Sequence, residues 1–424
     1  MGTLRAGVAV VDITPPSGLL LAGFAARSEP ATGVHDALTA RAVVVGDTAV
    51  VVADVIAIHE EMSARIRERC LLPAGNVIVA ATHTHGAPIS MAGRLSADAD
   101  PAFLRAIEDG CVEAIARAAA SAAPARITVG MGADPDVARN RRYEGGLTDP
   151  ALPVLRIRDA EGSLVAVVVS YALHPTVLGA DNRLITGDFP HFVRAAIEAE
   201  HPGAVAVFLN GCAGDVTIGH TAHGSISLAA DASRTFESAQ RVGERIAKAA
   251  LAAPEMPIGD AVSASEQMME LALERREQDL PRLAAEWEAA ALTADPAHQK
   301  LLRYWANWAR THADVDPGTW TGRVSLLDWG GVPIVALPGE ILAETGLSIR
   351  ASCGDRPAFV LCFADGTPGY IPPASEYGFG GYEVDEAHRF YGMPGSFTSG
   401  SAERLAAVAQ SLLGLPKQAA KPME

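Results

Sequence analysis

Two histidines separated by a single residue come directly after a buried strand predicted at residues 76–81. These are His83 and His85, with Thr84 between them. Alternate side chains of an extended segment share one side, so both imidazoles are expected to face the same way. Neutral imidazole is a good zinc ligand, and the pair could bind a metal together or divide the roles of ligand and proton shuttle. A structural role, with one histidine bonded to the backbone, is an equally open interpretation.

A third histidine and an aspartate follow a later strand. His174 closes the strand predicted at Leu164–Tyr171, and Pro175 restricts it to extended backbone. Asp188 stands at the start of the helix predicted at Phe189–Glu200. Its carboxylate could orient a metal-bound histidine, but capping the helix is the favoured role.

Glu340 is a further candidate ligand. It follows a buried strand predicted at 333–337 and the turn Pro338-Gly339. Its carboxylate could begin the helix predicted at 341–350 or bind a metal, and the residues leave both open. In α/β proteins the loops at strand ends converge on functional sites, so these strand ends are expected to contribute to one site.

The elements that must position these residues alternate along the chain. Short β-branched runs are separated by longer alanine-rich amphipathic segments, which is typical of the α/β class with mixed sheets layered with helices. Hairpins are predicted at 40–56, 153–171 and 323–337, further strands at 127–131, 204–210 and 358–363, and helices at 59–70, 103–119 and 233–251. No internal repeat or linker is apparent, so residues 1–424 are expected to form a single catalytic domain.

Two segments depart from this alternation. Residues 264–315 are rich in Glu, Gln, Arg, Ala and Trp, which predicts a helical insertion. It could form a lid, but packing against a sheet is favoured. Residues 365–400 are irregular and dense in Gly, Pro, Tyr and Phe, and loops of this length in compact domains are usually functional.

Composition excludes several classes of function. A net charge of −16 argues against a general affinity for nucleic acid or anionic membranes. The five scattered cysteines form no CxxC pair, which favours a reduced compartment and offers no thiolate metal site. With no apparent signal peptide and no apolar run of membrane-spanning length, we expect a cytoplasmic protein without stable membrane association.

Several short motifs occur in a fixed order along most of the chain. They are Gly7-Val8-Ala9-Val10-Val11-Asp12-Ile13-Thr14-Pro15-Pro16, Ala81-Thr82-His83-Thr84-His85-Gly86-Ala87-Pro88, Asn140-Arg141, His174 with Thr186-Gly187-Asp188, residues 210–217, Pro338-Gly339-Glu340, and Glu376-Tyr377. Read together, they resemble the catalytic domain of the neutral (non-lysosomal) ceramidase family. The resemblance implies that family's fold, with a single zinc held by His83, His174, Glu340 and Tyr377.

The resemblance also implies the remaining roles. Tyr370 or Tyr382 could take the place of Tyr377, because tyrosine spacing in this loop is loose. His85 and Arg141 would polarise the scissile carbonyl and stabilise its oxyanion. The residue types agree with this, because two imidazoles and a carboxylate leave zinc an open position for water, whose pKa it lowers toward about 7.

The sequence departs from the family pattern in three places. Thr217 stands where the family has serine in the loop after the glycine-rich turn, and Gly86-Ala87-Pro88 replaces Ser-Gly-Pro beside the histidines. No counterpart of the family's C-terminal β-sandwich domain is apparent. The expected substrate is therefore a small amide, lactone or ester, and not a long-chain sphingolipid at a membrane.

The favoured function is zinc-dependent hydrolysis of a small N-acyl amide or ester by attack of zinc-bound water. One alternative is a metal-independent hydrolase in which Thr217 or Ser170 is the nucleophile with a histidine base, although no GxSxG motif is present. Another is a relative that binds metal or ligand without catalysis. A homo-oligomer whose neighbouring subunit contributes to the pocket is left open.

Overall fold

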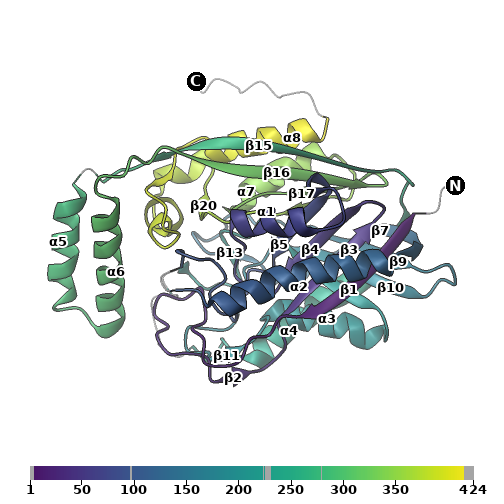
Figure 1. Ribbon diagram of the computed structural model, residues 1–424, viewed down its shortest axis with the longest axis horizontal. Helices are drawn as coiled ribbons and strands as arrows, with labels where there is room; N and C mark the ends of the chain where they lie inside the picture. The colour runs from purple at the N-terminus through teal and green to yellow at the C-terminus, as the bar shows by residue number, and fades with distance from the viewer. Residues whose placement is uncertain (1–3, 96–97, 223, 225–230, 278, 415–424) are drawn as a thin grey trace.

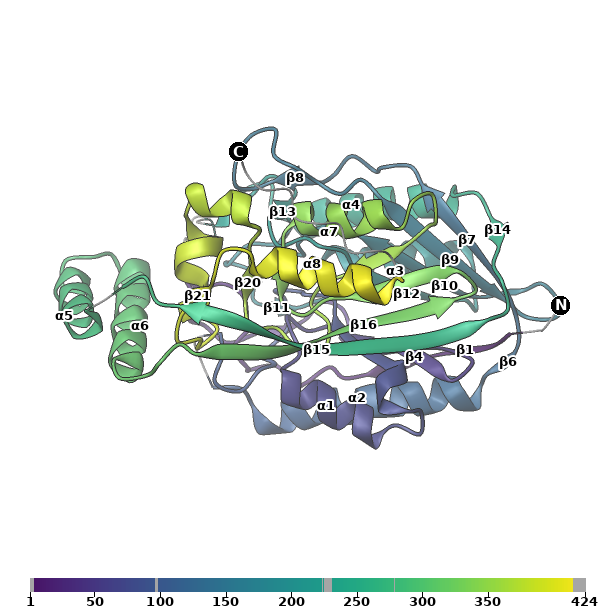
Figure 2. The same cartoon turned by 90° about the horizontal axis from the view of Figure 1, so that it is seen from above.

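The computed structural model describes residues 4–95, 98–222, 224, 231–277 and 279–414. Three five-stranded sheets form the body of the described chain, and helices cover their outer faces (Figures 1 and 2). Each sheet is mixed, with one parallel pair at an edge and antiparallel pairs elsewhere. The predicted α/β class with mixed sheets is confirmed.

The first sheet is built from the N-terminal part of the chain. Its order is β5-β4-β3-β1-β6, and helix α1 connects β4 to its parallel neighbour β5. Helix α2 packs on β1 and β3. The bounds are β1 Arg5–Asp12, β3 Thr39–Val45, β4 Thr48–Ala53, α1 Glu60–Arg69, β5 Val77–Ala81, α2 Pro101–Ala120 and β6 Ala123–Pro124.

The second sheet repeats this plan. Its order is β12-β10-β9-β7-β14, helix α3 connects β10 to its parallel neighbour β12, and α4 packs on β7 and β9. The bounds are β7 Arg126–Gly132, β9 Leu152–Arg158, β10 Leu164–Tyr171, α3 Phe189–Glu200, β12 Val205–Asn210, α4 Phe236–Leu251 and β14 Met256–Pro257.

The third sheet repeats it again. Its order is β19-β17-β16-β15-β21, helix α7 connects β17 to its parallel neighbour β19, and α8 packs on β15 and β16. The bounds are β15 Val262–Glu274, β16 Thr319–Trp329, β17 Val332–Ala336, α7 Ala343–Ser352, β19 Phe359–Leu361, β21 Ser396–Phe397 and α8 Ser401–Leu412.

The same succession of elements thus occurs three times: three antiparallel strands, a helix, a parallel strand and a covering helix. The sequence shows no internal repeat, because the repetition lies in topology and in the apolar periodicity of each element. One apolar cluster draws on all three sheets, including Val43, Ile157 and Ile334. This shared core holds the three units together.

The parallel edge strands of the three sheets meet at their C-terminal ends. Isolated bridges join Ala80 to Ala364 and Gly211 to Leu361. The Asn210 side chain donates from Nδ2 to the carbonyl of Thr82 at 3.1 Å. The loops that leave β5, β12 and β19 therefore emerge at one place.

Three short ladders organise the loops at this end of the molecule. Two are parallel and one is antiparallel. They pair β2 (Gly33–Val34) with β11 (Leu184–Ile185), β8 (Arg139–Asn140) with β13 (Val216–Thr217), and β18 (Glu340–Ile341) with β20 (Tyr370–Ile371).

The segment predicted as a helical insertion at 264–315 contains a helical hairpin, α5 (Leu280–Ala291) and α6 (Pro296–His312). Its first part, however, is strand β15, which pairs with β16 from Val262 to Ala272. Glu, Gln, Met and Leu favour helices locally, but pairing along β16 overrides that preference.

The hairpin projects from the end of the body where the loops gather (Figures 1 and 2). It has an apolar cluster of its own, centred on Trp308. Its polar contacts reach loops instead of a sheet face: Trp308 Nε1 donates to the carbonyl of Met393, and Lys300 donates to the carbonyl of Arg27. Packing against a sheet, the favoured expectation, is not what these contacts show.

Residues 365–400 fold into short turns around β20 and β21. These are η3 (Ala374–Gly378), the π-helical turn η4 (Tyr382–Glu386) and η5 (Ala387–Arg389). Among the described residues, no helix combines the length and the apolar character that crossing a membrane requires.

Candidate metal centre

His83 stands two residues after β5, at the junction of the three sheets. Its backbone N–H donates to the carbonyl of Val55 at 3.0 Å, and its ring stacks on Phe363 with centroids 3.8 Å apart. Its Nδ1 lies 2.6 Å from the carbonyl oxygen of Ile56. The residue has a φ of +67°, a left-handed conformation that strains any side chain other than glycine and is often found at functional sites.

His174 follows β10, as the sequence predicted, and reaches the same point from the second sheet. Its backbone N–H donates to Val216 and its Nδ1 lies 3.0 Å from the carbonyl of Ala213. The Nε2 atoms of His83 and His174 are 2.9 Å apart. Both rings are buried.

His85 is the third imidazole of this cluster. Its Nε2 lies 3.4 Å from the Nε2 of His83, so the two rings do share a side. Strand alternation is not the reason, because the left-handed turn at His83 ends the extended segment. Gly23 makes room for the His85 ring, since a Cβ there would lie 2.2 Å from Nδ1.

A buried guanidinium fixes the loops around His85. Arg27 donates to the carbonyls of His85, Ala22, Gly179 and Ala180. Three chain segments, around residues 22, 85 and 179–180, are thereby tied to one side chain, which holds His85 against the rest of the site.

Glu340 brings a carboxylate from the ladder β18–β20, in the loop that follows β17 of the third sheet. Its Oε2 lies 3.4 Å from Nε2 of His83 and 3.7 Å from Nε2 of His174. That oxygen is buried and has no hydrogen-bond partner among the described residues. The other oxygen, Oε1, accepts from the hydroxyl of Tyr391. Burial and then the charge of Glu340 raise the pKa of Tyr391, so its hydroxyl stays a donor.

These atoms fit a metal ion. The Nδ1 atoms of His83 and His174 donate to carbonyls, so each Nε2 presents a lone pair, and two lone pairs 2.9 Å apart repel without a cation between them. A shared proton is disfavoured, because burial and then His83 and Arg141 hold the pKa of His174 well below its ordinary value. Two ligand atoms that each lie about 2.0–2.1 Å from a tetrahedral zinc are roughly 3.3 Å apart, which is close to the spacing of the Nε2 atoms of His83 and His174.

Replacing Tyr391 with phenylalanine should lower metal affinity by about 10- to 100-fold, because Glu340 loses the hydroxyl that orients it. Tyr377→Phe is the matched control. The Tyr377 hydroxyl donates to the carbonyl of Phe397 at 2.7 Å, and the residue does not line the pocket. Competition with a chromophoric chelator measures both affinities. If Tyr377→Phe lost metal affinity and Tyr391→Phe did not, Tyr377 and not Tyr391 would be the tyrosine that supports the metal site.

Arg141 lies beside this cluster and has two anchors. Its Nη2 donates to the hydroxyl of Tyr370 at 2.7 Å and its Nε to Glu383 at 2.8 Å. Ladder β8–β13 positions it, since its own N–H donates to the carbonyl of Asp215. The guanidinium is buried with its charge balanced by Glu383, as expected for a fixed cation in a low-dielectric site.

Thr217 lines the pocket, but its hydroxyl is engaged within its own turn. It donates to the carbonyl of His220 at 2.8 Å and accepts from the N–H of Gly219 at 3.0 Å. Asp188 caps α3, the role the sequence favoured: it accepts from the N–H of Phe189 and also from Leu178.

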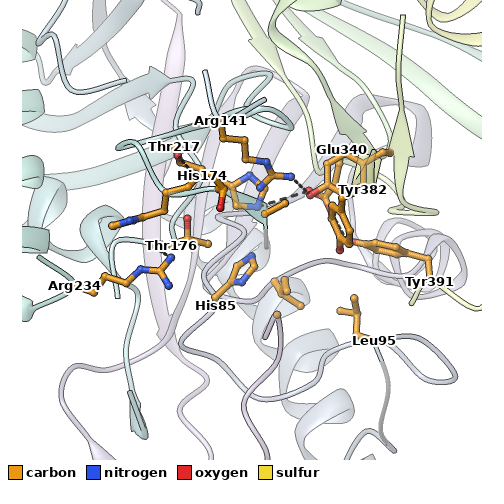
Figure 3. A pocket seen from close by; sticks show the side chains of 16 residues that line it. His85, Leu95, Arg141, His174, Thr176, Thr217, Arg234, Glu340, Tyr382 and Tyr391 are labelled. Carbon is orange, nitrogen blue, oxygen red and sulfur yellow. Dashed lines mark hydrogen bonds and ion pairs between the residues drawn. The ribbon is translucent and has the colours of Figure 1, made fainter. Parts of the chain in front are cut away.

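One pocket joins most of the predicted residues. It has a volume of about 30 Å³, room for roughly two ordered waters. Glu340, Tyr382 and Tyr391 form one side, Arg234, Thr176 and Thr217 the other, and His85 and His174 lie between them (Figure 3). Sequence reasoning missed Tyr391, Arg234 and His220. Tyr391 sits in the segment singled out as functional, but no spacing distinguished it from the other tyrosines.

Comparison with known proteins decides the family. Residues 4–225, just over half of the chain, match the family described as neutral/alkaline non-lysosomal ceramidase, N-terminal. The chain belongs to this family. The three histidines and Arg141 lie inside the matched range, whereas Glu340 and Tyr391 lie beyond it.

Relatives within the ceramidase family are distant in sequence. The chain is 28% identical to the neutral ceramidase of Drosophila melanogaster over 307 residues, which is 59% of this chain and 44% of that protein. It is 29% identical to the neutral ceramidase of Pseudomonas aeruginosa over 248 residues, 50% of this chain and 37% of that protein. The matched stretch thus spans less than half the length of these relatives.

Solved ceramidase structures share the fold. The neutral ceramidase from Pseudomonas aeruginosa superposes with a TM-score of 0.72 at 18% identity, over 99% of this chain and 76% of that one. A ceramidase complexed with C2 gives the same TM-score at 19% identity, over 99% and 77%.

One departure from the family motif now has a structural explanation. Gly86 lies where two backbone segments touch, because a Cβ there would be 2.5 Å from the carbonyl oxygen of Thr186. Its role is close packing behind the ceramidase-family histidines, and it does not line the pocket.

Proposed function

We propose that this chain is a zinc-dependent hydrolase of small amides, with N-acyl compounds as the favoured class and esters or lactones as secondary substrates. The observation that carries the proposal is the meeting of three buried imidazoles with an unpartnered carboxylate oxygen of Glu340, at a pocket that Arg141 also lines. Membership of the ceramidase family supports an amide bond as the target.

His83, His174 and Glu340 would hold the ion, with Tyr391 fixing the carboxylate. When bound, zinc supplies a Lewis acid that polarises a carbonyl and lowers the pKa of water toward about 7. Tyr370 and Tyr382 line the same pocket and would complete the polar wall near Glu340.

The neighbouring side chains supply the remaining chemistry. Arg141 offers a fixed positive charge to an oxyanion, a contribution typically about 10²–10³-fold per donor. Burial, followed by His83, Arg27 and Arg141, keeps the pKa of His85 well below its ordinary value, so His85 is neutral. Its buried Nδ1 has no partner among the described residues, which leaves it available to a polar atom of the substrate.

We also propose that the three sheets act as one catalytic domain. The supporting observation is that His83, His174 and Glu340 follow strands of three different sheets, while one apolar cluster contains residues of all three sheets. No single sheet with its helices contains a complete ligand set.

The test is metal removal and return on the full chain. Purified protein should contain about one zinc per chain, lose hydrolysis of a short N-acyl amide after exhaustive chelation, and regain it on adding zinc. A panel of matched amides, esters and lactones ranks the substrate classes. Hydrolysis that continues unchanged in metal-free protein would rule the proposal out.

Thr217→Ala separates this mechanism from nucleophilic attack by the threonine. The Thr217 hydroxyl proton is directed to a backbone carbonyl, so its removal should reduce kcat by less than about tenfold through loosening of the turn. A nucleophile's loss would instead abolish activity. Steady-state kinetics of Thr217→Ala beside Thr217→Ser measure the difference, and complete inactivity of a folded Thr217→Ala protein would favour the metal-independent alternative.

A further inference from the structure

The wall of the pocket opposite Glu340 is cationic and has no part in the proposed metal chemistry. Arg234, which precedes α4, extends into the pocket next to Thr176 (Figure 3). His220 and Thr221 line the same wall. Each of these residues lies outside the set that would bind zinc or face the oxyanion.

Arg234 has hydrogen-bond donors to spare. Its Nε is buried without a partner among the described residues, and its Nη2 makes one long contact, 3.4 Å, with the carbonyl of Thr176. Within the described ranges its guanidinium forms no ion pair. Burial lowers the pKa of Arg234, and the more distant charges of Asp231, Asp188 and Asp181 only partly oppose this. The buried guanidinium groups of Arg141 and Arg194, by contrast, are each paired with a carboxylate.

His220 adds a second unsatisfied polar atom to this wall. Its Nε2 is buried and has no partner in the described part of the chain, while its Nδ1 lies 3.7 Å from a carboxylate oxygen of Asp231. Buried polar groups are normally hydrogen-bonded, so two such atoms beside one pocket indicate a missing polar partner. A guanidinium with a free Nε–H and Nη–H presents the fork that matches a carboxylate.

A second cavity opens beside the polar pocket and is mostly apolar. It has a volume of about 60 Å³, and the two share Gly23, Leu95, Ala222 and Tyr382 as lining residues. Leu20, Ile89 and Phe390 supply apolar surface within it. A short acyl chain fits such a surface, whereas a charged group belongs at Arg234.

We propose that the substrate is a small N-acyl amide with a carboxylate on its amine part, an N-acyl amino acid in chemical class, and that Arg234 and His220 bind this carboxylate. The inference rests on the proposed amide hydrolysis and specifies its substrate. The two ends of the substrate are then recognised separately: the apolar cavity binds the acyl chain, and the cationic wall binds the carboxylate.

The kinetic test uses zinc-loaded full-length protein and N-butanoyl derivatives of glycine, β-alanine and 4-aminobutyrate, each beside its neutral carboxamide. For the best spacer, kcat/KM should be about 10- to 100-fold higher for the carboxylate, as expected for charge-assisted hydrogen bonds. Arg234→Gln should bring the ratio of the two kcat/KM values close to one. Arg234→Lys should keep part of the wild-type preference for the carboxylate. Arg241→Gln, which removes an exposed guanidinium from α4, should keep the wild-type ratio.

A binding measurement separates failure of this inference from failure of the proposed function. The matching ketones, 4-oxoheptanoate, 5-oxooctanoate and 6-oxononanoate, replace the amide nitrogen by methylene and cannot be hydrolysed. Calorimetry should show one of them binding at least about tenfold more tightly than its carboxamide, with the difference lost in Arg234→Gln. If this holds while no amide is cleaved, the hydrolase proposal fails and the carboxylate site stands. If amides are cleaved but neither ratio depends on Arg234, the carboxylate site is wrong.

Discussion

Replacing His83 with asparagine should leave a folded protein that no longer retains zinc, and amide hydrolysis should fall by about 10³-fold or more. In the proposed metal centre His83 would be the central ligand, because its Nε2 lies within 3.4 Å of His174, His85 and Glu340 alike. Asparagine is chosen because it tolerates the left-handed backbone at this position better than alanine. Metal analysis and initial rates measure the two effects.

The control for this variant is His298→Ala, which removes an exposed histidine from α6. It should retain zinc and wild-type rates. Circular dichroism of His83→Asn checks that the fold survives. A His83→Asn protein with a full complement of zinc and an unchanged rate would contradict the assignment of the metal centre.

Replacing Arg194 with methionine should destabilise the fold by about 3–5 kcal/mol, because it leaves the carboxylate of Asp54 buried without its counter-charge. The Arg194 guanidinium donates to both oxygens of Asp54, at 2.7 and 2.9 Å, and both side chains are almost fully buried. Asp54 also accepts from the N–H and the hydroxyl of Thr39. Denaturant unfolding at neutral pH measures the loss.

The pair also predicts a pH dependence. Burial raises the pKa of Asp54. The charge and hydrogen bonds of Arg194, together with the hydrogen bond from Thr39, outweigh this effect of burial and leave the pKa below its ordinary value. A lowered folded-state pKa means that this stabilisation is present above the unfolded pKa, near about 3.9, and is lost as pH falls through the folded value. The stability difference between wild type and Arg194→Met should therefore be largest at neutral pH and shrink in acid.

Two control variants test whether the loss of stability in Arg194→Met comes from the unpaired buried charge. Arg117→Met breaks an exposed pair with Glu113 on α2 and should change stability by about 0–1 kcal/mol. The double variant Asp54→Leu with Arg194→Met should recover much of the loss, because no buried charge remains unpaired. An Arg194→Met protein as stable as wild type at neutral pH would contradict the importance of the pair.

This ion pair matters to the metal centre through the backbone. Asp54 directly follows β4, and the next two residues, Val55 and Ile56, provide the carbonyls that hold His83. Arg194 lies on α3, whose first turn Asp188 caps. Loss of the pair should therefore loosen His83 as well as the fold.

The positions of the proposed ligands at strand ends could be predicted from the sequence because that information is local. Apolar runs define β5, β10 and β17, and His83, His174 and Glu340 are the chemically capable residues that follow them. Their meeting was inferred from the general tendency of loops at strand ends to converge and from the resemblance to the ceramidase family. The contacts that produce it, such as Asn210 with Thr82 and the bridge between Ala80 and Ala364, join residues far apart in the chain.

The tyrosines show why the rest could not be predicted. In residues 365–400 the chain has no periodicity, so sequence position does not indicate which side chain turns inward. The parallel pairing of β18 with β20 places Tyr370 opposite Glu340, and the turns that follow bring in Tyr382 and Tyr391. Tyr377 turns instead toward Phe397. Helix α8, by contrast, has an ordinary amphipathic pattern at Ser401–Leu412 that a local analysis could have identified.

The threefold recurrence of the sheet unit has a consequence for how such a site can arise. A trimer of identical chains would bring three copies of the same side chain to its axis. Three linked units in one polypeptide can each change separately, so one contributes His83, the next His174 and the third Glu340. Covalent fusion thus permits a mixed ligand set, with different chemistry on each flank, which a homomeric assembly of the same architecture could not offer.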